Sequence, residues 1–322
     1  MSKVCITGAS GFVGQALCLA LVKLNRPVRG VARTLTSKLM ASGVEYMAID
    51  NLDSDTNWTS ALAGVDFVIH CAARAHVMKE TETDSLTAYR SVNVNGSKRL
   101  AEQAAAAGVR RLVYVSSIKA KVESIDGLLR PFVTYKHEGE LDALAPDDHY
   151  GASKREAEQA LWAVAAKTGL ELVVVRPSLV YGPGVKGNLA SLIKLVRSGV
   201  PLPFGAVHNQ RSMIGLDNLV DLLIRCVDHP KIAGQTLLVS DGEDVSTPEL
   251  LRLMATAMGR SLHLFPVPVP LLWLAGCSFG KRAEIERLVG SLQIDSRYTR
   301  ELLEWTPTVS LAEGIRRMVH GS

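Results

Sequence analysis

The chain has few cysteines and shows no metal-binding pattern in its 322 residues. Its five cysteines are an odd number, and no two of them have the Cys-x-x-Cys spacing, so the sequence indicates neither a disulfide framework nor a zinc site. The eight histidines form no His-x-x-x-His pair and no cluster with glutamate. We therefore expect a chemistry that needs no metal, with the cysteines serving as small buried apolar residues.

Charged blocks and long uninterrupted apolar runs are also lacking. The 36 basic and 32 acidic residues leave a net charge of +4 without any Lys/Arg cluster, which argues against nucleic-acid binding and leaves small anionic ligands open. The most apolar late segment, residues 264–279, is shorter than a bilayer span and contains three prolines. We expect it to form a substrate-lobe helix or a subunit contact, as in a homodimer, without membrane insertion. A strand follows Met-Ser-Lys directly and leaves no room for a signal peptide, so we expect a cytoplasmic protein.

The sequence begins with a strand, a glycine-rich turn and a helix. Residues 3–7 are apolar and rich in β-branched side chains, and a helical spacing of apolar residues starts at Gly11. Gly8, Gly11 and Gly14 have the spacing Gly-x-x-Gly-x-x-Gly. The first permits a sharp turn, the second lets backbone N–H groups approach a pyrophosphate, and the third lets the helix pack closely on the sheet. The predicted cofactor contacts here are Gly8, Ser10, Gly11, Phe12, Val13 and Gly14.

The end of the second predicted strand bears on the choice of cofactor. In dinucleotide folds an acidic residue at this place binds the ribose 2′-hydroxyl, whereas an arginine accommodates a 2′-phosphate. Residues 28–33 end in Ala32 and Arg33 without an acid, which favours NADP(H). NAD stays open as the cofactor, because an exposed arginine after a strand is ordinary. Asp50 and Asn51, after the third strand, are candidate contacts for the adenine.

Strands and helices alternate over the first half of the chain. Further strands are predicted at residues 44–49, 65–70, 111–115 and 171–176. This alternation predicts an α/β fold, a Rossmann-type doubly wound parallel sheet with helices on both faces and ligands at the carboxyl ends of the strands. A helix over residues 85–107 is expected to be interrupted at 93–96. Ala72 and Ala73 follow the fourth strand, where their small side chains would let a cofactor lie against the backbone.

The composition changes after Pro177. Turn clusters rich in proline and glycine are followed by short helices with few strands. We therefore predict a dinucleotide-binding domain over residues 1–177 and a smaller, mainly helical substrate-binding lobe over 178–322. Residues 212–240 are expected to return to the first domain.

Tyr150 and Lys154 open a helical pattern that runs to about residue 168. Residues four apart share one face of a helix. An ammonium beside a phenol favours the phenolate and lowers its pKa, which prepares the phenol to exchange a proton with an alcohol or a ketone. Tyr-x-x-x-Lys is a short pattern, so taken alone it is equally consistent with an ordinary helix start.

Several distant motifs together resemble the extended short-chain dehydrogenase/reductase family, in particular its nucleotide-sugar branch. They are the glycine turn, Cys71-Ala72-Ala73, Asn93-Val-Asn-Gly96, Ser116-Ser117, Tyr150 to Lys154, Arg176 to Pro183 and Arg211 to Asn218. The resemblance implies that Ser117 hydrogen-bonds the substrate oxygen, that Tyr150 exchanges its proton and that Lys154 binds the nicotinamide ribose. It also places Asn93 in the cofactor site.

The same resemblance implies a UDP-sugar substrate. Arg211 corresponds to the arginine that holds the substrate diphosphate, and Asn188 to a residue that contacts the diphosphate region. Arg287 is a candidate for a second phosphate contact.

Three functions follow from these residues. In the sugar dehydratases an Asp-Glu pair follows the catalytic hydroxyl, but Ile118 and Lys119 stand there in this chain, which argues against dehydration. The favoured function is NADPH-dependent reduction of a UDP-4-keto-6-deoxy-hexosamine. The alternative is a UDP-hexose or UDP-N-acetylhexosamine 4-epimerase with bound NAD. The third is a non-catalytic dinucleotide-binding protein, against which the complete set of Ser117, Tyr150 and Lys154 counts.

Overall fold

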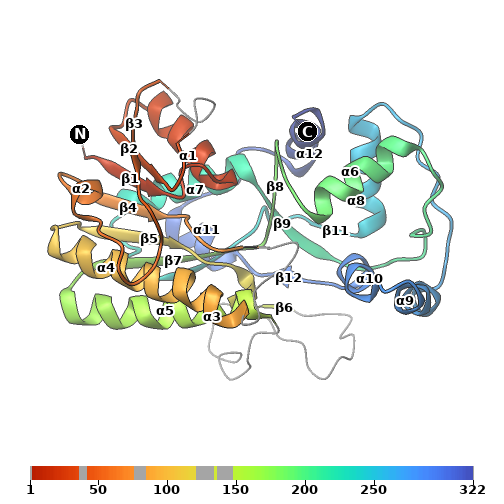
Figure 1. The fold of residues 1–322 in the computed structure, drawn as a ribbon. Helices are drawn as coiled ribbons and strands as arrows, with labels where there is room; N and C mark the ends of the chain where they lie inside the picture. Colours follow the sequence, from red (N-terminus) through yellow and green to blue (C-terminus); the bar gives the residue numbers. More distant parts are fainter. Residues whose placement is uncertain (1, 36–41, 76–84, 121–133, 136–147, 322) are drawn as a thin grey trace.

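The computed structural model describes residues 2–35, 42–75, 85–120, 134–135 and 148–321. Its largest element is a seven-stranded sheet of parallel strands in the order β10-β7-β5-β4-β1-β2-β3 (Figure 1). The strands are β1 (Val4–Thr7), β2 (Val28–Ala32), β3 (Val44–Ala48), β4 (Phe67–His70), β5 (Arg111–Val115), β7 (Glu171–Pro177) and β10 (Thr236–Val239). The predicted doubly wound sheet is confirmed, and its direction of winding reverses between β1 and β4.

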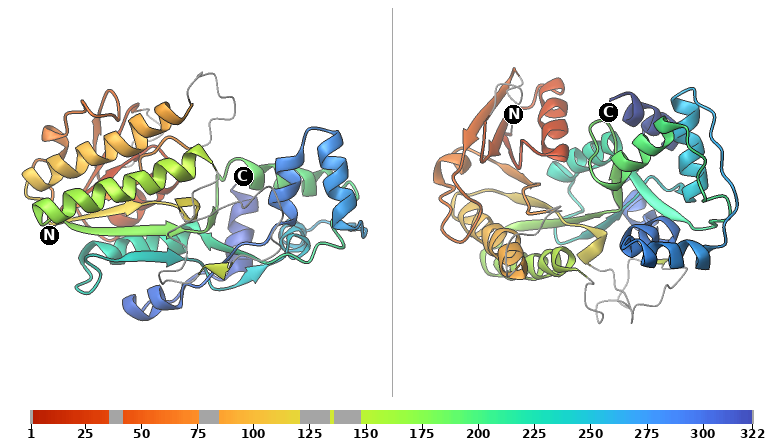
Figure 2. Two further views of the ribbon diagram at one scale, coloured as in Figure 1. Left: turned by 90° about the horizontal axis from the view of Figure 1, so that it is seen from below. Right: turned by 45° about the vertical axis from the view of Figure 1, so that its right-hand side comes forward.

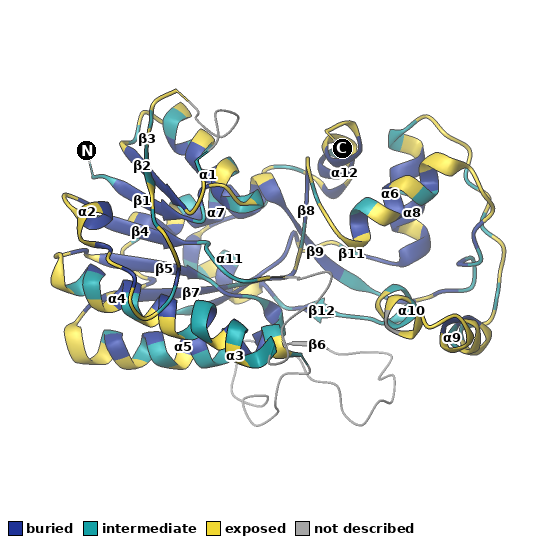
Figure 3. Ribbon diagram, viewed as in Figure 1, coloured by how far each residue is buried: buried dark blue, intermediate teal, exposed yellow. Residues whose placement is uncertain are grey.

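Successive side chains of the strands enter two different cores. Ile6 and Val175 pack on one face, whereas Cys5 and Val174 pack on the other, as the two-residue period of a strand requires. The first face is covered by α1 (Phe12–Lys23) and α7 (Leu216–Asp228), and the second by α2 (Thr59–Leu62), α4 (Ser97–Ala106) and α5 (His149–Thr168). Helices α4 and α5 lie side by side (Figure 2). The strands are therefore buried on both faces, and the helices expose only their outer surfaces (Figure 3).

The helix predicted over residues 85–107 is present, and the interruption expected at 93–96 is a π-helical segment and not a break in the helix. Helix α3 (Ser85–Tyr89) passes into a π-helical segment, η2 (Arg90–Gly96), and then into α4. Gly96 has helical φ and ψ angles of −63° and −42°. A Cβ atom there would lie 2.8 Å from the Leu52 side chain, so the glycine allows close packing and does not break the helix.

A second region with its own core follows β7. Strands β8 (Leu179–Tyr181), β9 (Arg211–Gly215) and β11 (Asp244–Val245) form a small sheet in the order β11-β9-β8. The helices around it are α6 (Asn188–Ser198), α8 (Thr247–Ala257), α9 (Val269–Ser278), α10 (Arg282–Val289) and α12 (Leu311–His320). Strand β12 (Gln293–Ile294) pairs with β6 (Thr134–Tyr135). Figure 1 shows this mainly helical lobe beside the large sheet.

The chain crosses between the two regions more than once. Helix α7 and strand β10 pack on the large sheet, but β9 belongs to the small one, so the return predicted for residues 212–240 begins at α7. Helix α11 (Arg297–Leu303) also packs beside β10, and Trp305 Nε1 donates a hydrogen bond to Asp221 of α7 at 2.7 Å. This second return had no sequence signal. Within the described ranges, no helix is both long and apolar enough to cross a bilayer.

Candidate active site at the carboxyl ends of the strands

Four strand ends lie next to one another along one edge of the sheet. Thr7 is in register with His70, and Val115 with Val175, so the residues that follow β1, β4, β5 and β7 emerge at the same level. This edge of a doubly wound sheet is where ligands bind. The structure therefore brings together the glycine turn, the Cys71-Ala72-Ala73 turn and the pair Ser116-Ser117.

The glycine turn packs tightly against the end of β4 and against its own helix. Gly8 has a φ angle of 69°, and a Cβ atom there would lie 2.8 Å from the backbone N of Ala72. A Cβ atom at Gly14 would lie 2.2 Å from the Gly8 carbonyl oxygen. Gly11 is the N-cap of α1, where no side chain caps the helix and no acid occupies the first turn. The helix N-terminus is thus open to an anion, which fits the pyrophosphate of a dinucleotide.

The other predicted cofactor contacts are accessible to a ligand. The exposed ones are Ser10, Arg33, Asp50 and Asn51. The half-buried ones are Phe12, Val13, Ala72 and Ala73. Arg33 stands directly after β2, as the sequence predicted, but its exposure alone does not select between a 2′-hydroxyl and a 2′-phosphate.

Asn93 has a buried amide that bridges two segments at this edge. Its side chain is fully buried, its Oδ1 accepts from the Arg74 N–H at 2.8 Å, and its Nδ2 donates to the Arg74 carbonyl oxygen at 3.0 Å and to Ser153 Oγ at 2.9 Å. Ser153 Oγ in turn donates to the Tyr150 carbonyl oxygen at 2.8 Å. In the ligand-free chain the amide therefore joins the segment after β4 to the first turn of α5.

A second buried chain of polar groups supports the same edge. Thr7 Oγ1 and His70 Nδ1 are 2.5 Å apart, and His70 Nε2 lies 2.8 Å from Ser97 Oγ. Thr7 Oγ1 also accepts from the Ala72 N–H at 3.3 Å. Burial lowers the pKa of His70 to about 3, so the imidazole is neutral at pH 7. These contacts fix the backbone on which Ala72 faces the glycine turn.

Tyr150 and Ser117 are in direct contact. Ser117 is half-buried at the end of β5, and its hydrogen bond to Tyr150 lowers the pKa of the phenol. Burial has the larger effect, and together with the charge of Asp148 it raises the pKa of Tyr150 above its usual value. In the absence of ligands the phenol is therefore protonated at pH 7, which is the state of a proton donor.

Lys154 is buried beside Tyr150 but does not hydrogen-bond it. Its Nζ donates to the Val115 carbonyl oxygen at 2.8 Å and lies 4.5 Å from the Tyr114 ring centroid and 6.0 Å from that of Tyr150. Burial lowers the pKa of Lys154 to about 8. The predicted direct effect of the ammonium on the phenol is therefore absent in the ligand-free chain, where burial, Asp148 and Ser117 set the pKa of Tyr150.

Lys119, at the position where a sugar dehydratase has an acid, has a structural partner. It lies in the 3₁₀ turn η3 (Ile118–Ala120) and forms an ion pair with Asp148. Asp148 is also the N-cap of α5, with its Oδ1 accepting from the Gly151 N–H at 2.6 Å. The pair ties the turn that follows Ser117 to the start of the helix that carries Tyr150.

A buried carboxylate that the sequence did not single out lies deeper in the same edge. Glu158 is 3% exposed and contacts Ser116 and Arg176. The available signal was its position four residues after Lys154, on the helix face that carries the two predicted catalytic residues. Charged residues on helices usually face solvent, so the pattern alone favoured an exposed Glu158.

The structure brings two of the three predicted phosphate contacts together. Arg211 opens β9, and its Nη1 donates a hydrogen bond to the backbone carbonyl oxygen of Arg287 on α10. Burial lowers the pKa of the Arg211 guanidinium, and no carboxylate in the described part of the chain pairs with either arginine. Asn188 is exposed at the first position of α6. The Arg211 guanidinium thus lies against the backbone of α10 at Arg287.

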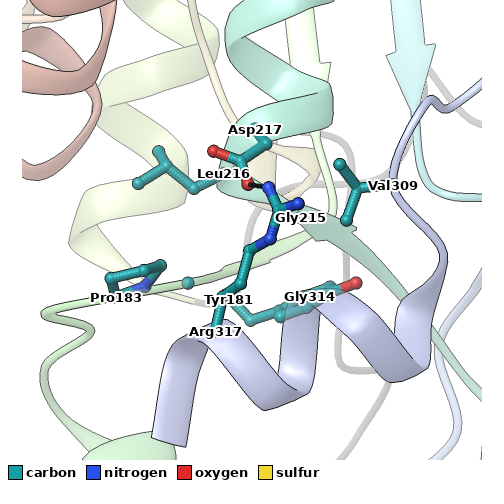
Figure 4. A pocket seen from close by; sticks show the side chains of 9 residues that line it. Tyr181, Pro183, Gly215, Leu216, Asp217, Val309, Gly314 and Arg317 are labelled. Carbon is teal, nitrogen blue, oxygen red and sulfur yellow. Dashed lines mark hydrogen bonds and ion pairs between the residues drawn. The ribbon is translucent and has the colours of Figure 1, made fainter. Parts of the chain in front are cut away.

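The segment around Tyr181 has a structural role. It packs against α12 around a cavity of about 10 Å³, which has room for one water molecule at most (Figure 4). Tyr181 donates to Asp241 at 2.8 Å, and Arg317 of α12 pairs with Asp217 at 2.6 Å. The Tyr-Gly-Pro sequence therefore fastens the C-terminal helix to the lobe.

The sequence of the chain is similar to those of known proteins. Residues 4–239 match the family described as the NAD dependent epimerase/dehydratase family. The chain belongs to this family. The resemblance to the extended short-chain dehydrogenases is thereby confirmed, and the chain is an enzyme of this type.

Three relatives show the range of the family. The UDP-glucose 4-epimerase of Vibrio cholerae is 43% identical, with 98% of this chain and 94% of that protein covered. The 2-alkyl-3-oxoalkanoate reductase of Stenotrophomonas maltophilia (strain K279a) is 30% identical, with 98% of both covered. The crystal structure of UDP-glucuronic acid 4-epimerase from Bacillus cereus in complex with NAD has a TM-score of 0.77 at 19% identity, covering 99% of this chain and 98% of that one. At this identity the last likeness concerns the fold.

Proposed function

We propose that the chain is a 4-epimerase that interconverts UDP-hexoses or UDP-N-acetylhexosamines with bound NAD. The observation that carries the proposal is the 43% identity, over 98% of the chain, to the UDP-glucose 4-epimerase of Vibrio cholerae. The sequence pattern alone favours NADPH-dependent reduction, but this relative supports the alternative. The glycine turn and the open N-terminus of α1 fit a dinucleotide.

The chemistry divides between the cofactor and the chain. The glycine turn and Lys154 would hold NAD, which would supply the acceptor and donor of the hydride at C4 of the sugar. For this step Tyr150 must be a phenolate, a form that the positive charge of a bound nicotinamide would favour over the phenol of the ligand-free chain. The phenolate would accept the O4 proton as C4 is oxidised and give it back as C4 is reduced, so protons and electrons balance over one cycle. Ser117, hydrogen-bonded to Tyr150, is placed to hold the same oxygen. Lys154 supplies a buried cation beside both for the nicotinamide ribose.

The nucleotide end of the substrate is assigned to the second lobe. The Arg211 side chain contacts the backbone of Arg287, and a guanidinium can bind phosphate oxygens with two parallel hydrogen bonds. Asn188, exposed at the start of α6, is a further candidate for the diphosphate. Binding energy from the nucleotide would help to seat C4 near the reacting groups.

The test is to incubate the purified protein, without added nucleotide, with UDP-glucose, UDP-galactose and their N-acetylamino counterparts. An epimerase converts each member of a pair into the same equilibrium mixture and releases NAD when it is denatured. Tyr150→Phe serves as the inactive control. Absence of interconversion for both pairs, in a preparation that holds NAD, would overturn the proposal.

A second candidate is reduction of a UDP-4-keto-6-deoxy-hexosamine with NADPH. It is favoured by the sequence at the end of β2, where Ala32 and Arg33 stand and an acid is missing. The 30% identical relative is also named a reductase. Consumption of NADPH with such a ketone, together with tighter binding of NADPH than of NADH, would support it. Arg33→Ala should then weaken only NADPH, whereas an epimerase with NAD should be indifferent to the change.

A further inference from the structure

Glu158 is a buried carboxylate that the proposed chemistry does not use. It lies on α5 one turn beyond Lys154 and is 3% exposed. Ser116 Oγ donates to its Oε1, and Arg176 Nε lies 3.0 Å from Oε1 and 3.2 Å from Oε2. The cluster therefore joins the ends of β5 and β7 to the catalytic helix.

Stability alone does not account for this cluster. An ion pair in the protein interior recovers about as much energy as it loses on desolvation, and apolar replacements of similar volume are often as stable. The same helix carries a more exposed pair, Glu156 with Arg90 at 2.6 Å, which needs no burial to form. The position of the Glu158 carboxylate between the ends of β5 and β7 indicates that it has a function at those strand ends.

The partner that Glu158 holds lies between two functional contacts. Ser116 follows Val115, whose carbonyl oxygen accepts the hydrogen bond from Lys154 Nζ at 2.8 Å. It precedes Ser117, which hydrogen-bonds Tyr150. Fixing Ser116 therefore fixes the backbone that anchors the lysine and the hydroxyl that faces the phenol.

The charges around Lys154 make Glu158 distinctive. The titratable groups of the neighbouring segments that face the lysine and are neutral at pH 7 are His70, Cys71, Tyr114 and Tyr150. Burial lowers the pKa of Lys154, and the negative charge of Glu158 raises it. Arg176, on β7, is the opposing cation and is itself paired with Glu158.

We propose that Glu158 is a positioning residue that holds the Ser116 backbone in place and keeps the buried Lys154 ammonium charged. The inference rests on the proposed function only in taking Lys154 and Ser117 as members of the active site. It assigns to Glu158 no contact with substrate or cofactor.

The experiment measures the titration of Lys154 directly, by NMR of protein labelled with ¹³Cε-lysine. Lys154→Arg serves to assign the signal. Glu158→Gln removes the charge, Glu158→Asp keeps it with a shorter reach, and the double variant Glu158→Gln with Arg176→Gln removes both charges. Glu156→Gln, on the same helix, is the matched control. Thermal unfolding is recorded for each.

Glu158→Gln should lower the midpoint of the Lys154 titration by about one pH unit or more, since it removes a nearby negative charge. The double variant should lower the Lys154 midpoint less, because the Arg176 cation, which Glu158→Gln leaves unpaired, is removed as well. The double variant also serves as the test if Glu158→Gln does not fold. Glu158→Asp and Glu156→Gln should leave the midpoint within about 0.3 units. Lower thermal stability in all Glu158 variants, with an unchanged Lys154 midpoint, would overturn the proposal and leave a structural ion pair.

Turnover gives an independent readout. The basic limb of the pH profile should move to lower pH in Glu158→Gln by the same amount as the NMR midpoint, and it should not move in Glu156→Gln. A shift of the NMR midpoint in a protein that turns over none of the UDP-sugars would contradict the proposed function and leave the role of Glu158 intact. If the enzyme is active but neither the NMR midpoint nor the basic limb moves in Glu158→Gln, the proposed role of Glu158 is wrong and the proposed function stands.

Discussion

At the scale of single residues, Tyr150 shows how burial and hydrogen bonding compete at one atom. Burial and Asp148 raise the pKa of the phenol, and Ser117 lowers it. The sequence spacing correctly predicted that Tyr150 and Lys154 share a helix face. It could not predict that the lysine would donate its hydrogen bond to Val115, because that carbonyl belongs to a strand 39 residues earlier.

Tyr150→Phe tests the proton-transfer role. It should lower turnover by about two to four orders of magnitude, the range for positioned acid–base groups, and leave NAD affinity nearly unchanged. Steady-state kinetics and a binding titration measure the two effects. Tyr298→Phe, at an exposed tyrosine, is the control. Turnover within a few-fold of the wild type would remove Tyr150 from the mechanism.

His70 makes a separate prediction about acid stability. Its pKa is about 3 in the folded chain against the ordinary value of 6.5, so between these pH values the unfolded chain binds a proton that the folded chain does not. Stability therefore falls as the pH drops through this window, by about 2 kcal/mol between pH 7 and pH 5. His70→Asn should lose less over that interval, as measured by urea unfolding. An equal loss in the variant and the wild type would show that other groups govern the acid response; His263→Asn, at an exposed histidine, is the control.

At the scale of elements, the regular parts of the first domain were predictable and the polar contacts between them were not. Short β-branched runs and glycine spacing identify β1, its turn and α1, because both signals are local. The interruption predicted at 93–96 takes the form of a π-helical segment, which the sequence did not indicate, and the Asn93 amide in it satisfies the backbone of Arg74 and the hydroxyl of Ser153. A sequence pattern shows that Asn and Gly are poor helix formers. It does not show the tertiary contacts that compensate for their low helix propensity.

Gly14→Ala tests the element on which cofactor binding depends. Its Cβ atom would meet the Gly8 carbonyl oxygen at 2.2 Å, so the turn must move away from the N-terminus of α1. We expect NAD affinity to fall by about a hundredfold or more, or about 2.7 kcal/mol. The measurement is a calorimetric titration with NAD.

The matched control for Gly14 is Gly169→Ala at the C-cap of α5. Gly169 has a φ angle of 77° with open space around it, so the variant should lose about 1 kcal/mol of stability and retain its NAD affinity. Equal affinities of the Gly14 variant and the wild type would show that the turn adapts without cost to the site.

At the scale of the whole molecule, the site depends on two regions that the chain visits alternately. The change of composition after Pro177 predicted the second lobe. The returns of α7, β10 and α11 to the large sheet involve contacts between residues far apart in sequence. The return of α11, which lies after residue 240, has no local sequence pattern that predicts it. Arg211 and Arg287 meet for the same reason: 76 residues separate them, and the Arg211 side chain reaches the backbone of α10 only in the folded chain.

Substitution of Arg211 tests whether the second lobe holds the substrate diphosphate. If it holds the substrate diphosphate, Arg211→Ala should raise KM for a UDP-sugar at least about tenfold, or about 1.4 kcal/mol, with NAD affinity unchanged. Arg211→Lys should also be costly, because an ammonium cannot replace a planar guanidinium that binds two oxygens at once. Some loss of kcat is expected as well, since a loosely held diphosphate would misplace C4. Arg316→Ala, which removes an exposed pair on α12, is the control for a lost surface charge. A KM equal to that of the control, or a loss confined to NAD binding, would place the diphosphate elsewhere, and Arg211 would then serve only to hold α10 through the carbonyl of Arg287.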